Sequence, residues 1–131
     1  MNNKLILVRG LPCSGKSTIA NHIDYTGFIH LETDQYWGPD YKFDMSKLGE
    51  AHQWCQDETA NMLGRGHDVV VSNTFTTKKE LQPYFDIAKR FGIVPQVILC
   101  QGQYGNIHNV PVEVLEKMKN RFEYDIGELY V

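Results

Sequence analysis

The stretch GLPCSGKS at residues 10–17 follows directly on the apolar run LILV at residues 5–8. It is a complete G-x-x-x-x-G-K-[ST] loop behind an expected strand, a pattern that predicts binding of the phosphates of a nucleoside triphosphate. With glycine at roughly 7% of residues, the pattern arises by chance in about one chain in two hundred of this length. That rarity favours a phosphate site over the alternative interpretation, a glycine-rich turn without a ligand.

Each residue type in this loop has a physical reason. Gly10 leaves the strand without a Cβ, and Gly15 lets the backbone approach the phosphates closely. A helix starting at about Gly15 would point its N-terminal amides at the phosphates. Lys16 would reach the β- and γ-phosphates and the Ser17 hydroxyl would bind Mg²⁺, so ATP and Mg²⁺ are the expected cofactors. The expected cofactor-binding residues are Gly10, Pro12, Cys13, Ser14, Gly15, Lys16, Ser17 and Thr18, with the Cys13 thiol interpreted as a small filler rather than a nucleophile.

The composition is that of one small domain. The chain has 131 residues, 42% of them hydrophobic, enough for a single sheet with its helices. It contains no run of eighteen apolar residues and no pattern like a signal peptide, so we expect a cytoplasmic protein without a membrane partner. Three widely spaced cysteines without a C-x-x-C pair fit reduced thiols. A net charge of −3 argues against a broad surface for duplex nucleic acid, but not against a short single strand.

Short β-rich runs alternate with helical patterns along the chain. This alternation predicts an α/β fold, a P-loop three-layer sandwich in which helices cover both faces of a mostly parallel sheet of four to five strands. The single domain would span residues 1–131. The expected strands are residues 4–9, 28–32, 68–72 and 94–100. The expected helices are residues 15–23, a second one that follows a cap at Asp44 or Ser46 and ends by Gly64, a third over 78–91, and a last one over 111–124.

Local patterns predict how these elements start and pack. The valines at 69–71 indicate a central strand that is buried on both faces. Thr77 and Glu80 have the spacing of a capping box. Residues 33–46 and 101–110 are polar and contain glycine, which favours loops, the second of them a lid. The expected apolar faces are Leu48, Ala51, Cys55, Thr59 and Met62 in the second helix, and Val114, Leu115, Met118 and Phe122 in the last.

Candidate acceptor residues follow the second expected strand. Ligands of open α/β sheets bind at the carboxyl ends of the strands. Asp34 is the first carboxylate past that strand and could accept the proton of a substrate hydroxyl, or it could be a turn or cap residue. Tyr36 and Trp37 could stack on a nucleobase, or they could form the wall of the cleft.

Four stretches carry a family resemblance in chain order: LVRGLPCSGKST at 7–18, ETDQYW at 32–37, AHQW at 51–54 and VSNT at 71–74. Together they resemble the polynucleotide 5′-hydroxyl kinase-like P-loop proteins, a group with many small phage and bacterial AAA-domain ATP-binding members. NIHNVP at 106–111 and MKNRFE at 118–123 are similar to the lid and C-terminal helix of that group. The resemblance covers nearly the whole chain, although only the phosphate loop is specific by itself.

The resemblance implies a kinase that moves the γ-phosphate of ATP to a hydroxyl, in its best-known members the 5′-hydroxyl of a nucleic-acid end. Lys16 would then be catalytic, Ser17 would bind the metal, and Asp34 would be the general base. The acceptor side would be formed by Thr33, Tyr36, Trp37, Asn73, Thr74 and His108. His108 is alternatively an ordinary polar residue of the lid.

The chain also departs from that family in two places. Asn73 stands where the nucleic-acid kinases commonly carry Asp, and residues 103–109 lack the lid arginines of those kinases. An arginine in that role is worth about 10³- to 10⁵-fold in rate. Arg121 is the predicted substitute; Arg9 is the other candidate, or instead supports the phosphate loop. The open alternatives are therefore a kinase for a nucleoside or another small molecule, and an ATP-binding module with little or no transfer activity.

Overall fold

The computed structural model describes residues 3–12, 14–39, 42–102, 111–124 and 127–130. Within these residues the strands form one parallel sheet in the order β2-β3-β1-β4-β5. The strands are β1 (Leu5–Arg9), β2 (Ile29–Leu31), β3 (Val69–Ser72), β4 (Gln96–Leu99) and β5 (Leu129–Tyr130). The α-helices are α1 (Lys16–Asp24), α2 (Leu48–Gly64), α3 (Lys78–Arg90) and α4 (Val112–Arg121), and the 3-10 helices are η1 (Thr33–Trp37) and η2 (Met45–Lys47).

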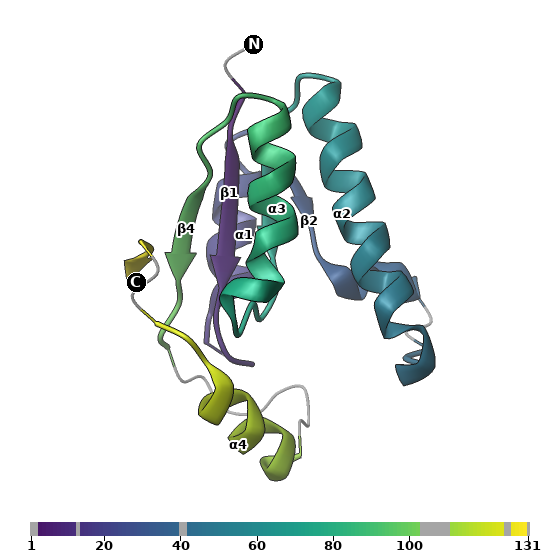
Figure 1. Cartoon of the computed structure of the whole chain (residues 1–131), viewed down its shortest axis with the longest axis vertical. Coiled ribbons are helices and arrows are strands. Elements are labelled where there is room, and N and C mark those ends of the chain that lie inside the picture. The colour runs from purple at the N-terminus through teal and green to yellow at the C-terminus, as the bar shows by residue number, and fades with distance from the viewer. Residues whose placement is uncertain (1–2, 13, 40–41, 103–110, 125–126, 131) are drawn as a thin grey trace.

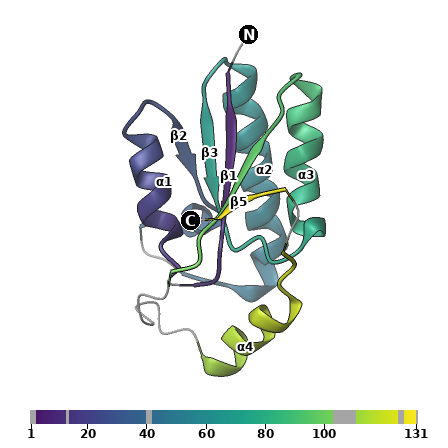
Figure 2. The same cartoon turned by 90° about the vertical axis from the view of Figure 1, so that its left-hand side faces the viewer.

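Helices cover both faces of the sheet, which confirms the three-layer fold. Figure 2 shows α1 on one face and α2 and α3 on the other. All four residues of β3 are buried, as the valine run predicted. Successive residues of a strand point to opposite faces of the sheet. Val70 therefore packs in one core cluster with Ala20 of α1, and Val69 and Val71 pack in the other cluster with residues of α2 and α3.

The described residues between β2 and α2 include helical turns where a loop was expected over residues 33–46. These turns are η1 and η2, and the Asp44 carboxylate caps η2 by accepting a hydrogen bond from the Ser46 N–H at 3.0 Å. The buried face of α2 runs through Ala51, Cys55 and Thr59 as predicted. Its fourth buried residue is Leu63 rather than Met62, which is only partly buried against the core.

The start of α3 agrees with its sequence pattern. Thr77 Oγ1 accepts a hydrogen bond from the Glu80 N–H at 3.3 Å, and the Glu80 carboxylate accepts one from the Thr77 N–H at 3.1 Å. These reciprocal bonds form the predicted capping box. None of the helices in the described part of the chain is long and apolar enough to cross a membrane.

The C-terminal part differs from the expected one. Figure 1 and Figure 2 show α4 beyond the carboxyl ends of the strands, apart from both helical layers. No residue within α4 is buried, so the expected apolar stripe does not enter the core there; Phe122, one residue past the helix, is buried instead. Strand β5 then adds to β4 with Ile98 paired to Leu129. A strand this short carries no hydrophobic periodicity, which explains why the sequence pattern did not predict it.

Candidate active site

The N-terminus of α1 is open at the carboxyl edge of the sheet. Gly15 precedes the helix with a φ of +93°, a left-handed conformation that favours glycine. Among the described residues no side chain caps this end, and its first turn has no acidic residue. The N-terminus of α3, in contrast, is capped by its own residues and by Glu123, whose Oε1 accepts from the Lys78 N–H at 2.6 Å. The N-terminal amides of α1, which follow the glycine-containing loop, can therefore bind an anion such as phosphate.

Gly10 fixes the start of the phosphate loop. A Cβ at this position would overlap Ser14 Oγ and lie 2.8 Å from the Cys100 carbonyl oxygen, so only glycine fits. The Gly10 N–H donates to the Thr74 carbonyl at 3.2 Å, and the Ser14 carbonyl accepts from the Gly102 N–H at 3.1 Å. These bonds fasten the loop to the ends of β3 and β4.

Lys16 and Ser17 are the first two residues of α1. Lys16 Nζ donates across the loop to the Leu11 carbonyl at 3.4 Å. Ser17 Oγ lies 3.5 Å from Glu32 Oε1, and the same carboxylate oxygen lies 3.1 Å from His30 Nε2. Glu32 is absent from the predicted site residues. The signal available for it was its position two residues before Asp34, at the carboxyl end of the second strand.

Asp34 is exposed in the first turn of η1, directly beyond β2. Its neighbour Thr33 is buried and anchors this turn. The Thr33 N–H donates to Asn73 Oδ1 at 2.9 Å, and Thr33 Oγ1 lies 3.3 Å from His52 Nδ1. The backbone that carries Asp34 is thus held by the end of β3 and by α2, while the general-base role of Asp34 stays a prediction.

Asn73 links two elements of the site. Its Oδ1 accepts from the Thr33 N–H, and its Nδ2 donates to Cys55 Sγ at 3.9 Å. An asparagine can do both because its amide carries an acceptor and a donor. Burial raises the pKa of the Cys55 thiol, which keeps this partner neutral. Asn73 also lines a cavity between α2 and α3, so substrate contact at this residue stays a prediction beside its observed bonds.

Replacing Asn73 with leucine is expected to lower the free energy of unfolding by about 1–3 kcal/mol, because the buried Thr33 N–H loses its acceptor. Urea denaturation followed by fluorescence measures this loss. Asn73→Asp is the matched control, since it keeps the acceptor and is expected to retain more stability than the leucine variant. A leucine variant as stable as the wild type would contradict the anchoring role.

Tyr36 and Trp37 belong to an aromatic cluster. The ring centroids of Tyr36 and Trp37 lie 5.4 Å apart, those of Trp37 and Phe43 5.2 Å, and those of Tyr36 and Trp54 6.1 Å. The Tyr36 hydroxyl donates to the Glu50 carboxylate at 3.1 Å, and this hydrogen bond raises the pKa of Tyr36. The rings thus contact one another, and their role as a wall of the cleft stays a prediction. Stacking of either ring on a nucleobase stays a prediction.

Arg9 is fully buried and paired inside the protein. Its Nη1 lies 3.0 Å from Glu128 Oε1, and both side chains are 0% exposed. Its Nε and Nη2 donate to the carbonyls of Phe75 and Thr76 at 2.9 and 3.3 Å, and its guanidinium lies 4.3 Å from the centroid of the Phe122 ring. Burial lowers the pKa of Arg9, and the Glu128 charge opposes that shift. These contacts support a role in holding the C-terminal segment rather than a phosphate.

Arg121 is exposed at the end of α4. Its Nε donates to Thr76 Oγ1 at 3.0 Å, and Thr76 Oγ1 donates in turn to Glu80 at 2.6 Å. Thr76 lies two residues beyond Thr74, whose carbonyl holds Gly10 of the phosphate loop. Of the two candidate arginines, Arg121 is therefore the one with solvent access near this edge, and its catalytic role stays a prediction.

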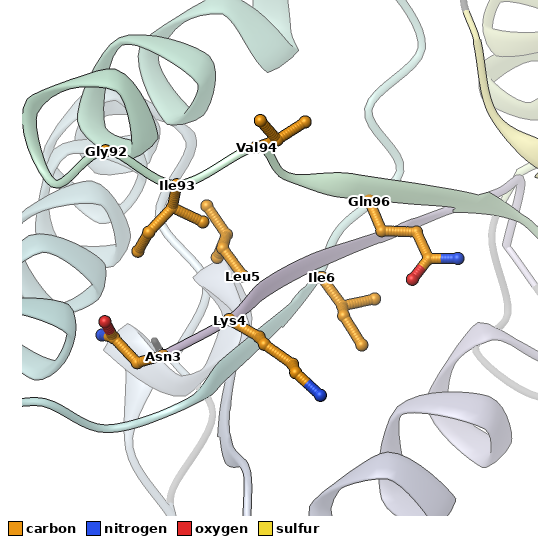
Figure 3. A pocket seen from close by; sticks show the side chains of 8 residues that line it. All are labelled: Asn3, Lys4, Leu5, Ile6, Gly92, Ile93, Val94 and Gln96. Atoms are coloured by element: carbon orange, nitrogen blue, oxygen red, sulfur yellow. The ribbon is translucent and has the colours of Figure 1, made fainter. Parts of the chain in front are cut away.

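Among the residues that the structure describes, two cavities at different edges of the sheet bear on the site. One of about 280 Å³ opens between α2 and α3 at the carboxyl end of β3, on the edge that carries the phosphate loop. A larger one, of about 390 Å³, lies at the opposite edge, between the start of β1 and the segment that joins α3 to β4 (Figure 3). Because ligands of such sheets bind at the carboxyl ends of the strands, the smaller cavity is the candidate acceptor site. It is lined by His52, Gln56, Asn73, Thr74, Phe75, Lys79, Glu80, Pro83 and Tyr84.

The predicted residues that the structure describes gather at one edge of the sheet. The phosphate loop with Pro12, Ser14 and Thr18, the η1 turn and the end of β3 all lie there. Cys13, His108 and residues 103–110 of the expected lid lie outside the described residues.

Comparisons with known proteins agree with this fold. A family model described as "AAA domain" matches residues 5–124. NEDD4-binding protein 2 of Homo sapiens is 34% identical over 91 residues; the match covers 66% of this chain and 5% of the length of that protein.

Three solved structures are similar at low sequence identity. A sugar kinase from Janibacter sp. HTCC2649 has a TM-score of 0.70 at 12% identity, over 98% of this chain and 83% of that chain. Kti12 of Chaetomium thermophilum in complex with ADP-AlF3 has a TM-score of 0.71 at 16% identity, over 97% and 88%. A chain of the Pnkp1/Rnl/Hen1 complex has a TM-score of 0.64 at 19% identity, over 88% and 38%. These likenesses establish a shared P-loop kinase-like fold.

Proposed function

The chain belongs to this family of AAA domains, and we propose that it is an ATP-dependent kinase that transfers the γ-phosphate to a hydroxyl, with the 5′-hydroxyl end of a polynucleotide as the leading acceptor. One observation carries the proposal. The uncapped N-terminus of α1, with Lys16 and Ser17, lies at the same sheet edge as the exposed carboxylate of Asp34 on its anchored turn. This arrangement supports a phosphate-donor half and an acceptor half at one edge of the sheet.

The donor half binds the triphosphate at α1. The N-terminal amides and the helix dipole attract the phosphates, and Lys16 exchanges its contact with the Leu11 carbonyl for the β- and γ-phosphates. Ser17 would hold Mg²⁺, since its hydroxyl is the kind of oxygen ligand that this ion prefers. Held there, the ion would supply positive charge that offsets the charge of the phosphates.

The acceptor half activates a hydroxyl. We place the acceptor oxygen between Asp34 and the γ-phosphorus. Asp34 takes the hydroxyl proton as that oxygen bonds to the γ-phosphorus, and the bond to the β–γ bridging oxygen breaks to release ADP. Arg121 is the proposed source of positive charge for the transferred group, in place of the arginines missing from residues 103–109.

The choice of acceptor rests on the family resemblance and on the cavity beside β3. Its lining combines the rings of Phe75 and Tyr84 with the polar groups of His52 and Gln56 and the cation of Lys79, a mixture suited to one nucleotide of a strand. A cavity of about 280 Å³ is also large enough for a free nucleoside or a sugar, and this favours a small-molecule kinase as the second candidate. We also propose a cytoplasmic location, which the free thiols of the described cysteines support.

Incubation with γ-labelled ATP and Mg²⁺ separates these candidates. Label is expected to enter a single-stranded oligonucleotide with a 5′-hydroxyl end, but not the same oligonucleotide with a 5′-phosphate. Lys16→Ala is the control and should transfer no label, because the cation that binds the β- and γ-phosphates is removed.

Nucleosides and sugars are tested in parallel. Label that enters one of them and not the oligonucleotide would identify a small-molecule kinase. Stabilisation of the fold by ATP, measured as a rise in Tm, without label on any acceptor would instead identify an ATP-binding module.

A further inference from the structure

We propose that Glu32 is a second protein ligand for the magnesium ion of the bound nucleotide, beside Ser17. This inference rests on the nucleotide-binding part of the proposed function. It assigns a role to a carboxylate that the donor and acceptor halves leave unexplained.

The placement of Glu32 directs its side chain toward the phosphate loop. The residue follows β2 in an extended conformation, with φ −140° and ψ 146°, and caps the start of η1 with its backbone. Its side chain is 25% exposed, and Oε1 lies 3.5 Å from Ser17 Oγ in the first turn of α1. The carboxylate therefore reaches from the acceptor half of the site to the donor half.

The separation of Ser17 Oγ and Glu32 Oε1 suits two ligands of one Mg²⁺ ion. Mg²⁺ binds oxygen ligands octahedrally at about 2.1 Å, so that neighbouring ligand oxygens lie about 3 Å apart. The observed 3.5 Å between Ser17 Oγ and Glu32 Oε1 is close to that separation, and a small side-chain rotation covers the difference. Because this ion commonly takes one or two protein ligands plus phosphate oxygens and waters, two protein oxygens suffice.

The negative charge of Glu32 would weaken the binding of a triphosphate unless a cation were bound between them. A negative group beside the phosphate loop repels a triphosphate, whereas a bound Mg²⁺ is attracted to both. His30 Nε2 lies 3.1 Å from Glu32 Oε1. If Glu32 served only to support β2, its replacement would change the Kd for ATP equally with and without Mg²⁺.

The test compares ATP binding with Mg²⁺ and with EDTA by isothermal titration calorimetry. Glu32→Gln is expected to weaken binding of ATP with Mg²⁺ about 10- to 100-fold, in the range that loss of a group supporting a metal site produces. The same variant is expected to bind metal-free ATP as tightly as the wild type or more tightly, because the repulsion is gone. Asp24→Asn, an exposed carboxylate at the far end of α1, is the matched control and should match the wild type in both conditions.

The other outcomes distinguish failure of the Glu32 proposal from failure of the proposed function. An unchanged ratio of the two Kd values in Glu32→Gln, whether both are equal to the wild type or both are weakened alike, would overturn the inference. Failure of the wild type to bind ATP even with Mg²⁺ would contradict the proposed function itself. If thermal unfolding shows that Glu32→Gln is not folded, Glu32→Asp tests the same ratio, and its shorter carboxylate is expected to lower the Mg²⁺ dependence.

Discussion

Replacing Asp34 with asparagine is expected to lower kcat for phosphoryl transfer by about 10²- to 10⁴-fold, the usual contribution of a general base. An amide has the size of the carboxylate but cannot take the hydroxyl proton. The Kd for ATP is expected to stay unchanged, because the proposed phosphate site lies at the N-terminus of α1 and does not include Asp34. Stability is also expected to stay unchanged, since the neighbouring Thr33 makes the contacts that anchor this turn.

Initial rates with the acceptor identified by label transfer check this expectation, together with calorimetric titration of ATP. Asp86→Asn is the matched control, an exposed carboxylate on α3, away from the phosphate loop. Transfer at the full rate by Asp34→Asn would assign Asp34 the turn role and exclude it as the base. A parallel loss of ATP binding would indicate damage to the donor half instead.

Features encoded by neighbouring residues could be predicted from the sequence. The phosphate loop depends on the spacing of Gly10, Gly15 and Lys16, the start of α3 on the spacing of Thr77 and Glu80, and the central strand on its run of valines. Each is decided within a few residues by backbone sterics, hydrogen bonding or burial. The parallel sheet with helices on both faces follows from the alternation of such segments.

Features that depend on contacts between distant residues could not be predicted. Ser17 and Glu32 come from different elements, and no local pattern joins them. Asn73 could be placed at the carboxyl edge by its position after a strand, but its bonds to Thr33 and Cys55 depend on tertiary packing. The structure therefore changes the interpretation of Asn73 from a residue that lacks a charge to one that fixes the η1 turn.

Among these contacts, the ion pair of Arg9 and Glu128 joins the residues that are farthest apart in the sequence. Arg9 also stabilises a strained loop. Phe75 has a φ of +45°, a conformation that costs a residue other than glycine about 1–3 kcal/mol. Arg9 binds the carbonyls of Phe75 and Thr76, while the Glu123 N–H donates to the Thr76 carbonyl at 2.7 Å. One buried guanidinium thus holds the loop after β3 and, through Glu128, the segment that leads into β5.

Arg9→Met is expected to lower the free energy of unfolding by about 3–5 kcal/mol, because it removes the positive charge that forms an ion pair with the buried Glu128 carboxylate. For a domain of this size, the Tm is expected to fall by about 10–20 °C. Urea denaturation and calorimetry measure the two quantities. Arg65→Met, which removes an exposed arginine at the end of α2, is the matched control and should change stability by less than about 0.5 kcal/mol.

The double variant Arg9→Met/Glu128→Met shows whether burial of the charge causes the loss. Replacing both partners of a buried ion pair with apolar residues is often neutral, whereas removing one partner is costly. The double variant is therefore expected to regain part of the stability that Arg9→Met loses, although the bonds to Phe75 and Thr76 and the contact with Phe122 stay lost. A double variant less stable than Arg9→Met would show instead that these bonds, and not the loss of the ion pair with Glu128, account for the effect.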